Sequence, residues 1–257
     1  MEITAVVLAA FFASMLTFFS GFGLGTILLP VFAIFFPVDV AIALTGLVHF
    51  ANNLFKITLV GKKTNRQVLL RFGIPAILAS FAGAWLLLRI TQMPSLFEYQ
   101  LSGRSLEVTP VKLVVAILLL VFSLLEVIPS VQRVQFGRGK LPIGGFLSGF
   151  FGGLTGIQGA VRSAFLIRSG LSKEAYIATG VVIASLVDFT RLSVYATRFK
   201  EAALQEHLVL ILAAVASAMA GALLGNSLLK KITLRFIQII VAVMLFLIAA
   251  ALGMGLI

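Results

Sequence analysis

The stretch Ser148-Gly149-Phe150-Phe151-Gly152-Gly153-Leu154-Thr155-Gly156-Ile157-Gln158-Gly159 decides how this chain folds, because a shorter version stands at Ser20-Gly21-Phe22-Gly23-Leu24-Gly25. Each copy is a glycine-broken apolar run, followed by a long apolar segment with polar residues deep inside it. In membrane proteins, glycine-interrupted hydrophobic segments at corresponding positions of two halves are typical of a transport site. The sequence therefore predicts a duplicated chain with its site at the two breaks.

The composition places the chain in a membrane. Of its 257 residues, 60% are hydrophobic and 11% are charged, and the mean hydropathy is +1.13. A soluble domain usually carries about 25% charged residues. Apolar segments of spanning length, about 20 residues, recur along the chain and leave no separate soluble domain. We expect an all-α polytopic membrane protein of about eight hydrophobic helical units.

Several classes of function are excluded or disfavoured by what the sequence contains. There is no cysteine, which excludes disulfides and thiolate metal sites. The net charge of +11 lies mostly in short loops, which favours topology signals and contact with anionic lipid over nucleic-acid binding. No metal-ligand spacing, nucleotide-binding loop or nucleophile–base arrangement is visible, so we predict no metal, no cofactor and no enzyme activity. Met1-Glu2-Ile3-Thr4 lacks the basic region of a signal peptide, so we expect the first apolar run to be retained.

Two apolar segments, 21–36 and 160–171, are short for a full crossing, and each follows a glycine cluster. Non-helical backbone at membrane depth survives only where it is buried in protein or lines a wet cavity. We therefore expect 3–36 and 141–171 to be glycine-broken helical hairpins, each followed by about three transmembrane helices. The expected division is a first repeat at 1–129, a cytoplasmic linker at 130–140 and a second repeat at 141–257.

Loop charges predict the relative orientation of the two repeats. The basic loops at 61–72, 130–140 and 229–235 are expected in the cytoplasm, and the mixed loop at 91–110 outside. Counting the crossings between them makes the second half an inverted copy of the first, provided that each broken hairpin enters and leaves on the same side. The alternative is a parallel repeat of plain crossings, in which one basic loop breaks the positive-inside rule.

Arg162 is the first candidate for a substrate contact, because a charged side chain inside an apolar span is expensive and functional by default. Its guanidinium needs a partner, which could be a carboxylate, carbonyls, water or an anionic substrate. The alternative is that Arg162 pairs with Asp188 and locks two helices together, and the two roles can coexist. Further candidates contribute hydroxyl, amide or open backbone groups near the two breaks. The predicted substrate-binding residues are Arg162, Gln158, Thr155, Ser163, Gly156, Gly159, Gly25, Thr26, Asn52 and Asn53.

Polar residues also lie inside the segments 39–60 and 174–197, which correspond to each other in the two repeats. In inverted copies these clusters would meet near the pseudo-two-fold axis, and a buried carboxylate and imidazole can carry a coupling proton. The alternatives are a local Asp–Arg pair, a histidine that only forms interhelical hydrogen bonds, and cations that snorkel to the interface. The coupling or gating candidates are Asp188, His49, Arg191 and Lys56.

Three runs resemble the sulfite exporter TauE/SafE family: Ser-Gly-Phe-Gly-Leu-Gly-Thr-Ile-Leu-Leu-Pro at Ser20 to Pro30, Ala-Ile-Ala-Leu-Thr-Gly at Ala41 to Gly46, and the glycine-rich run from Gly145 to Gly159. The resemblance covers nearly the whole chain and implies transport of small sulfur-containing or organic anions across a bacterial or archaeal plasma membrane, or an organellar relative of one. In many members the second signature continues into a proline-containing apolar run. Here Arg162 follows instead, which favours an anion that pairs with arginine over sulfite itself.

Together these features predict a multi-pass secondary transporter of the plasma membrane. Its substrate would be a small anion of the sulfur oxyanion, sulfonate or organic carboxylate class, bound at a midplane site between the repeats and moved by alternating access. The expected partners are this anion, the lipid bilayer and a coupling proton or other cation, with no nucleic acid; the oligomeric state is open. The alternatives are an anion channel built from the same residues and, third, a membrane-embedded enzyme.

Overall fold

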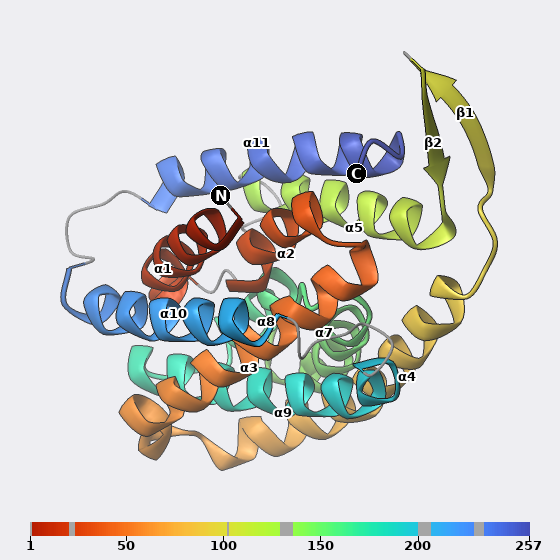
Figure 1. Ribbon diagram of the computed structural model, residues 1–257. Coiled ribbons are helices and arrows are strands. Elements are labelled where there is room, and N and C mark those ends of the chain that lie inside the picture. The colour runs from red at the N-terminus through yellow and green to blue at the C-terminus, as the bar shows by residue number, and fades with distance from the viewer. Residues whose placement is uncertain (1, 21–23, 102, 129–135, 200–206, 229–233) are drawn as a thin grey trace.

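The computed structural model describes residues 2–20, 24–101, 103–128, 136–199, 207–228 and 234–257 (Figure 1). Helices make up almost all of these ranges, so the all-α class of a polytopic membrane protein is confirmed. Some of the expectations above fall outside the described residues: the glycines at 21 and 23, part of the linker at 130–135 and the charges within 229–233.

Ten α-helices are described, five from each half of the chain. The first half contributes α1 (Glu2–Ser20), α2 (Leu24–Phe35), α3 (Val38–Val60), α4 (Arg66–Thr91) and α5 (Pro110–Val127). The second half contributes α7 (Leu141–Thr155), α8 (Gly159–Leu166), α9 (Lys173–Phe199), α10 (Leu208–Leu228) and α11 (Leu234–Gly253). The number exceeds the expected eight units because each broken hairpin contributes two helices. Short 3-10 turns, η1 (Gly61–Lys63) and η2 (Arg138–Lys140), precede α4 and α7.

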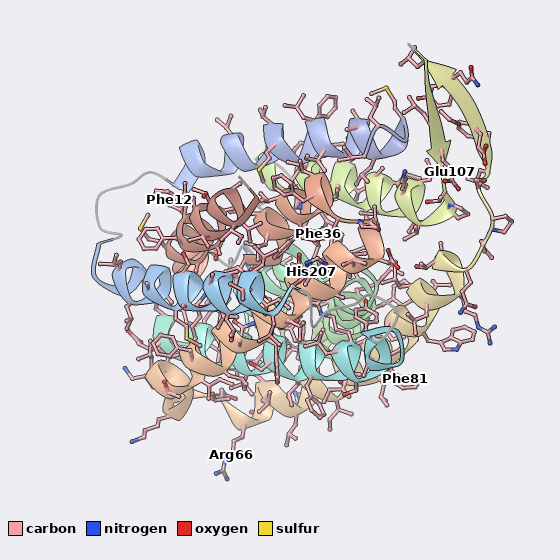
Figure 2. The ribbon with its side chains drawn as sticks, viewed as in Figure 1. Phe12, Phe36, Arg66, Phe81, Glu107 and His207 are labelled. Carbon is pink, nitrogen blue, oxygen red and sulfur yellow. The ribbon has the colours of Figure 1, made fainter. Side chains whose placement is uncertain are left out.

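The outer surface of the helical body is apolar. Phe12 and Phe81 project outward in Figure 2, and each is at least half exposed. Apolar side chains spread over a whole surface are stable against lipid, whereas soluble proteins keep such patches small. Four of the described segments are long and apolar enough to cross a membrane: Val38–Lys63, Arg66–Thr91, Lys173–Ala196 and Leu208–Gly225.

The short helices expected at 21–36 and 160–171 are present as α2, of 12 residues, and α8, of 8 residues. The second break has a defined geometry. Helix α7 ends at Thr155 and is capped by Gly156, whose φ of 82° lies in the left-handed region that glycine enters without steric cost. The chain then begins α8 at Gly159, so the backbone of this hairpin changes direction inside the protein.

Glycines let two pairs of helices approach backbone to backbone. A Cβ added at Gly145 or Gly149 of α7 would lie 2.1 Å from a carbonyl oxygen of α4. A Cβ at Gly221 of α10 would lie 2.2 Å from the carbonyl oxygen of Phe11 in α1, and Gly225 contacts Met15 in the same way. In each pair the two glycines are four residues apart on one helix face, a spacing that lets helices pack closely.

The main helix contacts recur when the two halves are exchanged. Contacts of α4 with α7 correspond to contacts of α10 with α1, and contacts of α4 with α9 correspond to those of α10 with α3. The equivalent helices α3 and α9 pack directly against each other, as do α5 and α11. Gly46 contacts Leu192, while Asn65, just beyond α3, donates its N–H to Thr179 Oγ1. Between these two contacts the residue number rises from 46 to 65 in the first half and falls from 192 to 179 in α9, so α3 and α9 run antiparallel.

A β-hairpin interrupts the helical pattern between α4 and α5. Strands β1 (Phe97–Leu101) and β2 (Arg104–Val108) pair antiparallel and project beyond the ends of α5 and α11 (Figure 1). Tyr99 donates a hydrogen bond to the carbonyl of Met254, which ties the hairpin to the residues after α11. The sequence interpretation treated this segment only as a loop of mixed charge.

Candidate functional site

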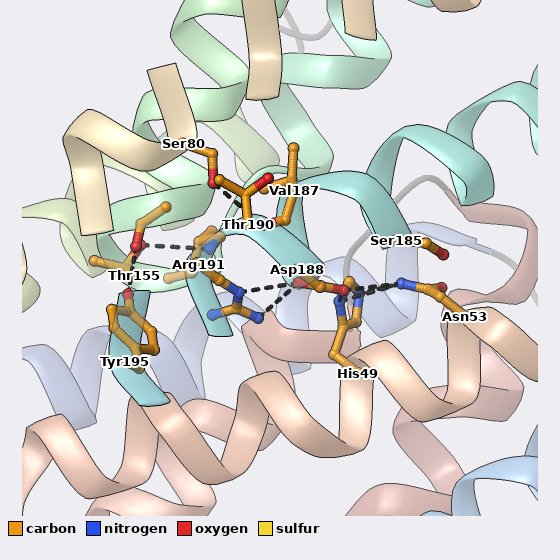
Figure 3. Close-up of polar contacts among 12 residues, drawn as sticks. His49, Asn53, Ser80, Thr155, Ser185, Val187, Asp188, Thr190, Arg191 and Tyr195 are labelled. Atoms are coloured by element: carbon orange, nitrogen blue, oxygen red, sulfur yellow. Dashed lines mark hydrogen bonds and ion pairs between the residues drawn. The ribbon is translucent and has the colours of Figure 1, made fainter. Parts of the chain in front are cut away.

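Asp188 lies at the centre of a buried polar cluster between α3 and α9 (Figure 3). Its Oδ2 lies 2.6 Å from His49 Nδ1 and accepts a hydrogen bond of 3.3 Å from Asn53 Nδ2. Its Oδ1 accepts a hydrogen bond of 3.0 Å from Arg191 Nε and lies 2.8 Å from Arg191 Nη2. Both carboxylate oxygens are therefore already occupied by partners from the protein.

The cluster joins polar positions that correspond in the two halves of the chain. His49 and Asn53 lie one turn apart on α3, and Asp188 and Arg191 lie on one face of the antiparallel helix α9. Arg191 is fully buried and Lys56 is 5% exposed, so neither cation extends to the membrane interface. The local Asp188–Arg191 pair exists, and it exists together with the contact to His49.

Arg191 also lies where the two glycine breaks meet. A Cβ added at Gly156 would lie 2.4 Å from Arg191 Nη1, and one added at Gly46 would lie 3.3 Å from Arg191 Cζ. A Cβ at Gly25, at the start of α2, would lie 3.3 Å from the carbonyl oxygen of Gly156. The missing side chains thus let the Arg191 guanidinium reach the point where the two broken elements pass each other. This point, lined by Gly25, Gly46 and Gly156, is called the crossing below.

Several buried polar atoms close to this crossing have no hydrogen-bond partner among the described residues. They include Arg191 Nη1, the hydroxyl of Thr45 and both amide atoms of Gln158. Thr45 contacts the crossing through Cγ2, 3.5 Å from where a Cβ on Gly25 would stand. Leaving such a group unsatisfied costs about 1–3 kcal/mol, so buried polar atoms normally have partners. These groups are the donors and acceptors that a small polar ligand would satisfy.

Arg162 is half-buried on α8 and extends toward α9, where its Nε lies 3.5 Å from the Cβ position of Gly180. The alternative pairing with Asp188 is not formed, because the ion pairs of Asp188 among the described residues are those with His49 and Arg191. Arg162 Nη1 is buried without a hydrogen-bond partner in the same described part. Lys56 lies within electrostatic reach of Arg162, so two like charges face each other here.

The charges around the cluster do not balance. Lys56 and Arg191 are buried and Arg162 is half-buried, whereas Asp188 is the sole buried carboxylate among the described side chains. Uncompensated charge is costly in a medium of low dielectric constant. This surplus of positive charge favours the binding of an anion.

The remaining substrate-binding candidates from the sequence differ in burial and in hydrogen-bond partners. Asn52 is fully buried and accepts a hydrogen bond from Ser14 of α1; with its amide turned over, its oxygen lies 3.2 Å from Lys56 Nζ. Thr155 donates to the carbonyl of Phe151 within α7, so its hydroxyl proton is used inside its own helix. Ser163 Oγ accepts a hydrogen bond of 2.9 Å from Tyr176. Thr26 is buried in α2, and Gly159 begins α8.

Two residues near the crossing were missed by sequence reasoning. Thr45 has an unpartnered hydroxyl, and Tyr195 donates a hydrogen bond to the carbonyl of Gly153 in α7. The signal for Thr45 was present, because Thr45-Gly46 recurs as Thr179-Gly180 in the second repeat. Nothing comparable marks Tyr195, whose role depends on how α9 packs against α7.

Comparison with known proteins decides the family. The model of the family described as sulfite exporter TauE/SafE matches residues 6–252 of this chain. The chain belongs to the TauE/SafE family. No curated relative and no solved structure matches it. As a TauE/SafE protein it is an integral, multi-pass membrane protein of a transporter family, which confirms the resemblance seen in the sequence.

Proposed function

We propose that this TauE/SafE protein is a secondary transporter that binds a small anion where the two glycine breaks meet. The observation that carries the proposal is the fully buried guanidinium of Arg191, which lies against Gly156 and Gly46 with Nη1 unpartnered among the described residues. A guanidinium pairs well with planar or clustered oxygens. The substrate class is therefore a sulfur oxyanion, a sulfonate or an organic carboxylate.

The groups around the crossing receive distinct roles. Arg191 supplies the positive charge at the crossing, while Arg162, to which the sequence assigned this role, is a second cation on α8. The Gln158 amide and the Thr45 hydroxyl supply hydrogen bonds, since both are buried and unpartnered in the described part of the chain. Glycines at the breaks keep side chains out of the space that the anion would occupy.

Alternating access would follow from two inverted repeats. The antiparallel packing of α3 on α9, together with main helix contacts that recur when the halves are exchanged, supports a two-fold axis perpendicular to these helices. For helices that cross the bilayer, such an axis lies in the membrane plane. One repeat then moves against the other around a central site, so that the anion can enter this site from either side of the membrane in turn. We place the protein in the plasma membrane, with its repeats at 1–129 and 141–257.

The test is anion flux into proteoliposomes, with methanesulfonate, sulfite and acetate as probes. We expect saturable uptake and counterflow by the wild type. Arg162→Ala and Arg191→Gln should each lose flux, while Arg66→Ala, which removes an exposed cation at the start of α4, should not (Figure 2). Because Arg191→Gln can also destabilise the fold, the half-buried Arg162 gives the cleaner variant. Full flux in both site variants would refute the site, and steady non-saturating current would indicate a channel.

A further inference from the structure

The coordination of Asp188 discriminates between the cations that could drive transport. A metal cation at this depth needs oxygen ligands with free lone pairs directed at it. Oδ2 of Asp188 faces His49 and Asn53, and Oδ1 faces Nε and Nη2 of Arg191. Lys56 and Arg162 add positive charge nearby and would repel a metal ion. A proton has no such requirement, because a single lone pair can accept it.

His49 provides such a lone pair on Nε2, because Nδ1, which contacts the carboxylate, carries the ring proton of the neutral form. Its Nδ1 lies 2.6 Å from Asp188 Oδ2, and both side chains are buried. Histidine is the side chain that ordinarily gains or loses a proton near neutral pH. We infer that the coupling ion is a proton and that the His49–Asp188 pair is its binding site; this inference rests on the proposed transport function.

Asp188 links this proton site to the anion site, because it contacts both His49 and Arg191. With His49 neutral, the negative charge of Asp188 offsets the positive charge of Arg191. With a proton on His49, the imidazolium shares that negative charge, and Arg191 is left with positive charge and an unpartnered Nη1 at the crossing. An anion then binds more tightly, and by reciprocity a bound anion favours the proton.

The other charged groups near the His49–Asp188 pair also make proton binding and anion binding favour each other. They are Lys56 on α3, Arg162 on α8 and Arg191 on α9, with the hydroxyl of Tyr195 nearby on α9. Helices α2, α7 and α10 carry no charged residue, α1 carries only Glu2, and the arginines of α4 are exposed. Since like charges repel, an imidazolium at His49 is best tolerated when an anion is also present. The empty site and the doubly loaded site are therefore the favoured states.

The test measures proton uptake on anion binding by the purified full-length protein. Methanesulfonate is the probe, because its charge does not change between about pH 5 and 8, the range in which histidine titrates. Calorimetric titration in two buffers of different ionisation enthalpy gives the number of protons bound with each anion. We expect uptake of up to one proton per anion, with affinity falling by up to about tenfold per pH unit as His49 loses its proton.

Two variants separate this site from the rest of the protein. His49→Gln should bind methanesulfonate weakly at every pH and without proton uptake. Asp188→Asn is the second variant: it removes the charge that offsets Arg191, so it should bind methanesulfonate tightly over the same pH range, with the proton uptake lost. His207→Gln is the matched control, because His207 is the other histidine and packs against the ring of Phe36, with 4.8 Å between ring centroids. This control should keep the proton uptake of the wild type.

Three results would overturn the inference: anion binding without proton uptake, unchanged pH dependence in His49→Gln, or flux that stops when choline replaces sodium. In each of these the protein still binds or moves an anion, so the proposed function survives. If the wild type binds none of methanesulfonate, sulfite and acetate, the proposed function fails and the inference fails with it.

Discussion

Gly156→Ala tests whether the second glycine break serves Arg191, and Gly103→Ala is its matched control. Both glycines have positive φ, 82° and 78°. A left-handed conformation costs a residue with a Cβ about 1–2 kcal/mol, so both variants should carry this loss. They differ in space, because a Cβ at Gly103 meets nothing within 4 Å, whereas one at Gly156 would lie 2.4 Å from Arg191 Nη1 and 2.9 Å from Cζ.

Arg191 has little room in which to retreat. It is fully buried, Asp188 holds its Nε and Nη2, and Gly46 lies against its Cζ. Relieving the collision by moving packed groups costs about 1–3 kcal/mol. We therefore expect the unfolding free energy of Gly156→Ala to fall by that amount beyond the fall in Gly103→Ala.

Anion binding should separate the two variants more clearly than stability does. Moving Nη1 away from the crossing removes a hydrogen bond to a charged group, worth about 1.5–3 kcal/mol. The dissociation constant for methanesulfonate should therefore rise roughly tenfold to a hundredfold in Gly156→Ala, and should not change in Gly103→Ala. The measurements are unfolding in mixed micelles and calorimetric titration of the folded protein. Equal affinity in the two variants would refute the placement of the anion at Arg191.

Two further predictions concern the stability of the helix contacts and of the buried pair. Gly149→Ala should lower the melting temperature in detergent, because its Cβ would lie 2.1 Å from the Ala76 carbonyl oxygen, while Gly73→Ala, with Leu69 Cδ1 at 3.4 Å, should match or exceed the wild type; equal melting of the two variants would contradict this. Asp188→Asn should cost about 3–5 kcal/mol of unfolding free energy, since it leaves buried cations uncompensated. The double variant Asp188→Asn with Arg191→Met should recover part of that loss, because it also removes the uncompensated cation; no recovery would argue against the Asp188–Arg191 ion pair.

The helices and the breaks could be predicted from the sequence because their causes are local. Apolar runs of spanning length must be helical in lipid, and glycine clusters mark where a helix stops. The internal repeat also paired the segments 39–60 and 174–197, and Asn53 and Asp188 from these two segments are hydrogen-bonded in the structure.

The position of the central cation could not be predicted in the same way. Arg162 follows the glycine run directly, so proximity in sequence favoured it. The structure instead brings Arg191 to Gly156 across α9, and this depends on the rotation of α9 and its packing against α3. A helical period specifies that Asp188 and Arg191 share a face, but not which element that face meets.

The β-hairpin was missed for a different reason. Its alternation of Phe97, Tyr99 and Leu101 before a Ser-Gly pair is a hairpin signal. The strand β1 is largely exposed, and the charges of Glu98, Arg104 and Glu107 led the sequence interpretation to treat the segment as a loop.

The close contact between α1 and α10 has a consequence for biosynthesis. Helix α1 leaves the ribosome well before α10, because residues 24–199 lie between them in the chain. Until α10 is made, the backbone surface of α1 around Phe11 and Met15 lacks the glycines that cover it in the finished protein. Lipid or the insertion machinery must therefore shelter α1 through most of translation. The protein cannot complete its packing one half at a time, and loss of the last two helices would leave the first helix without its main neighbour.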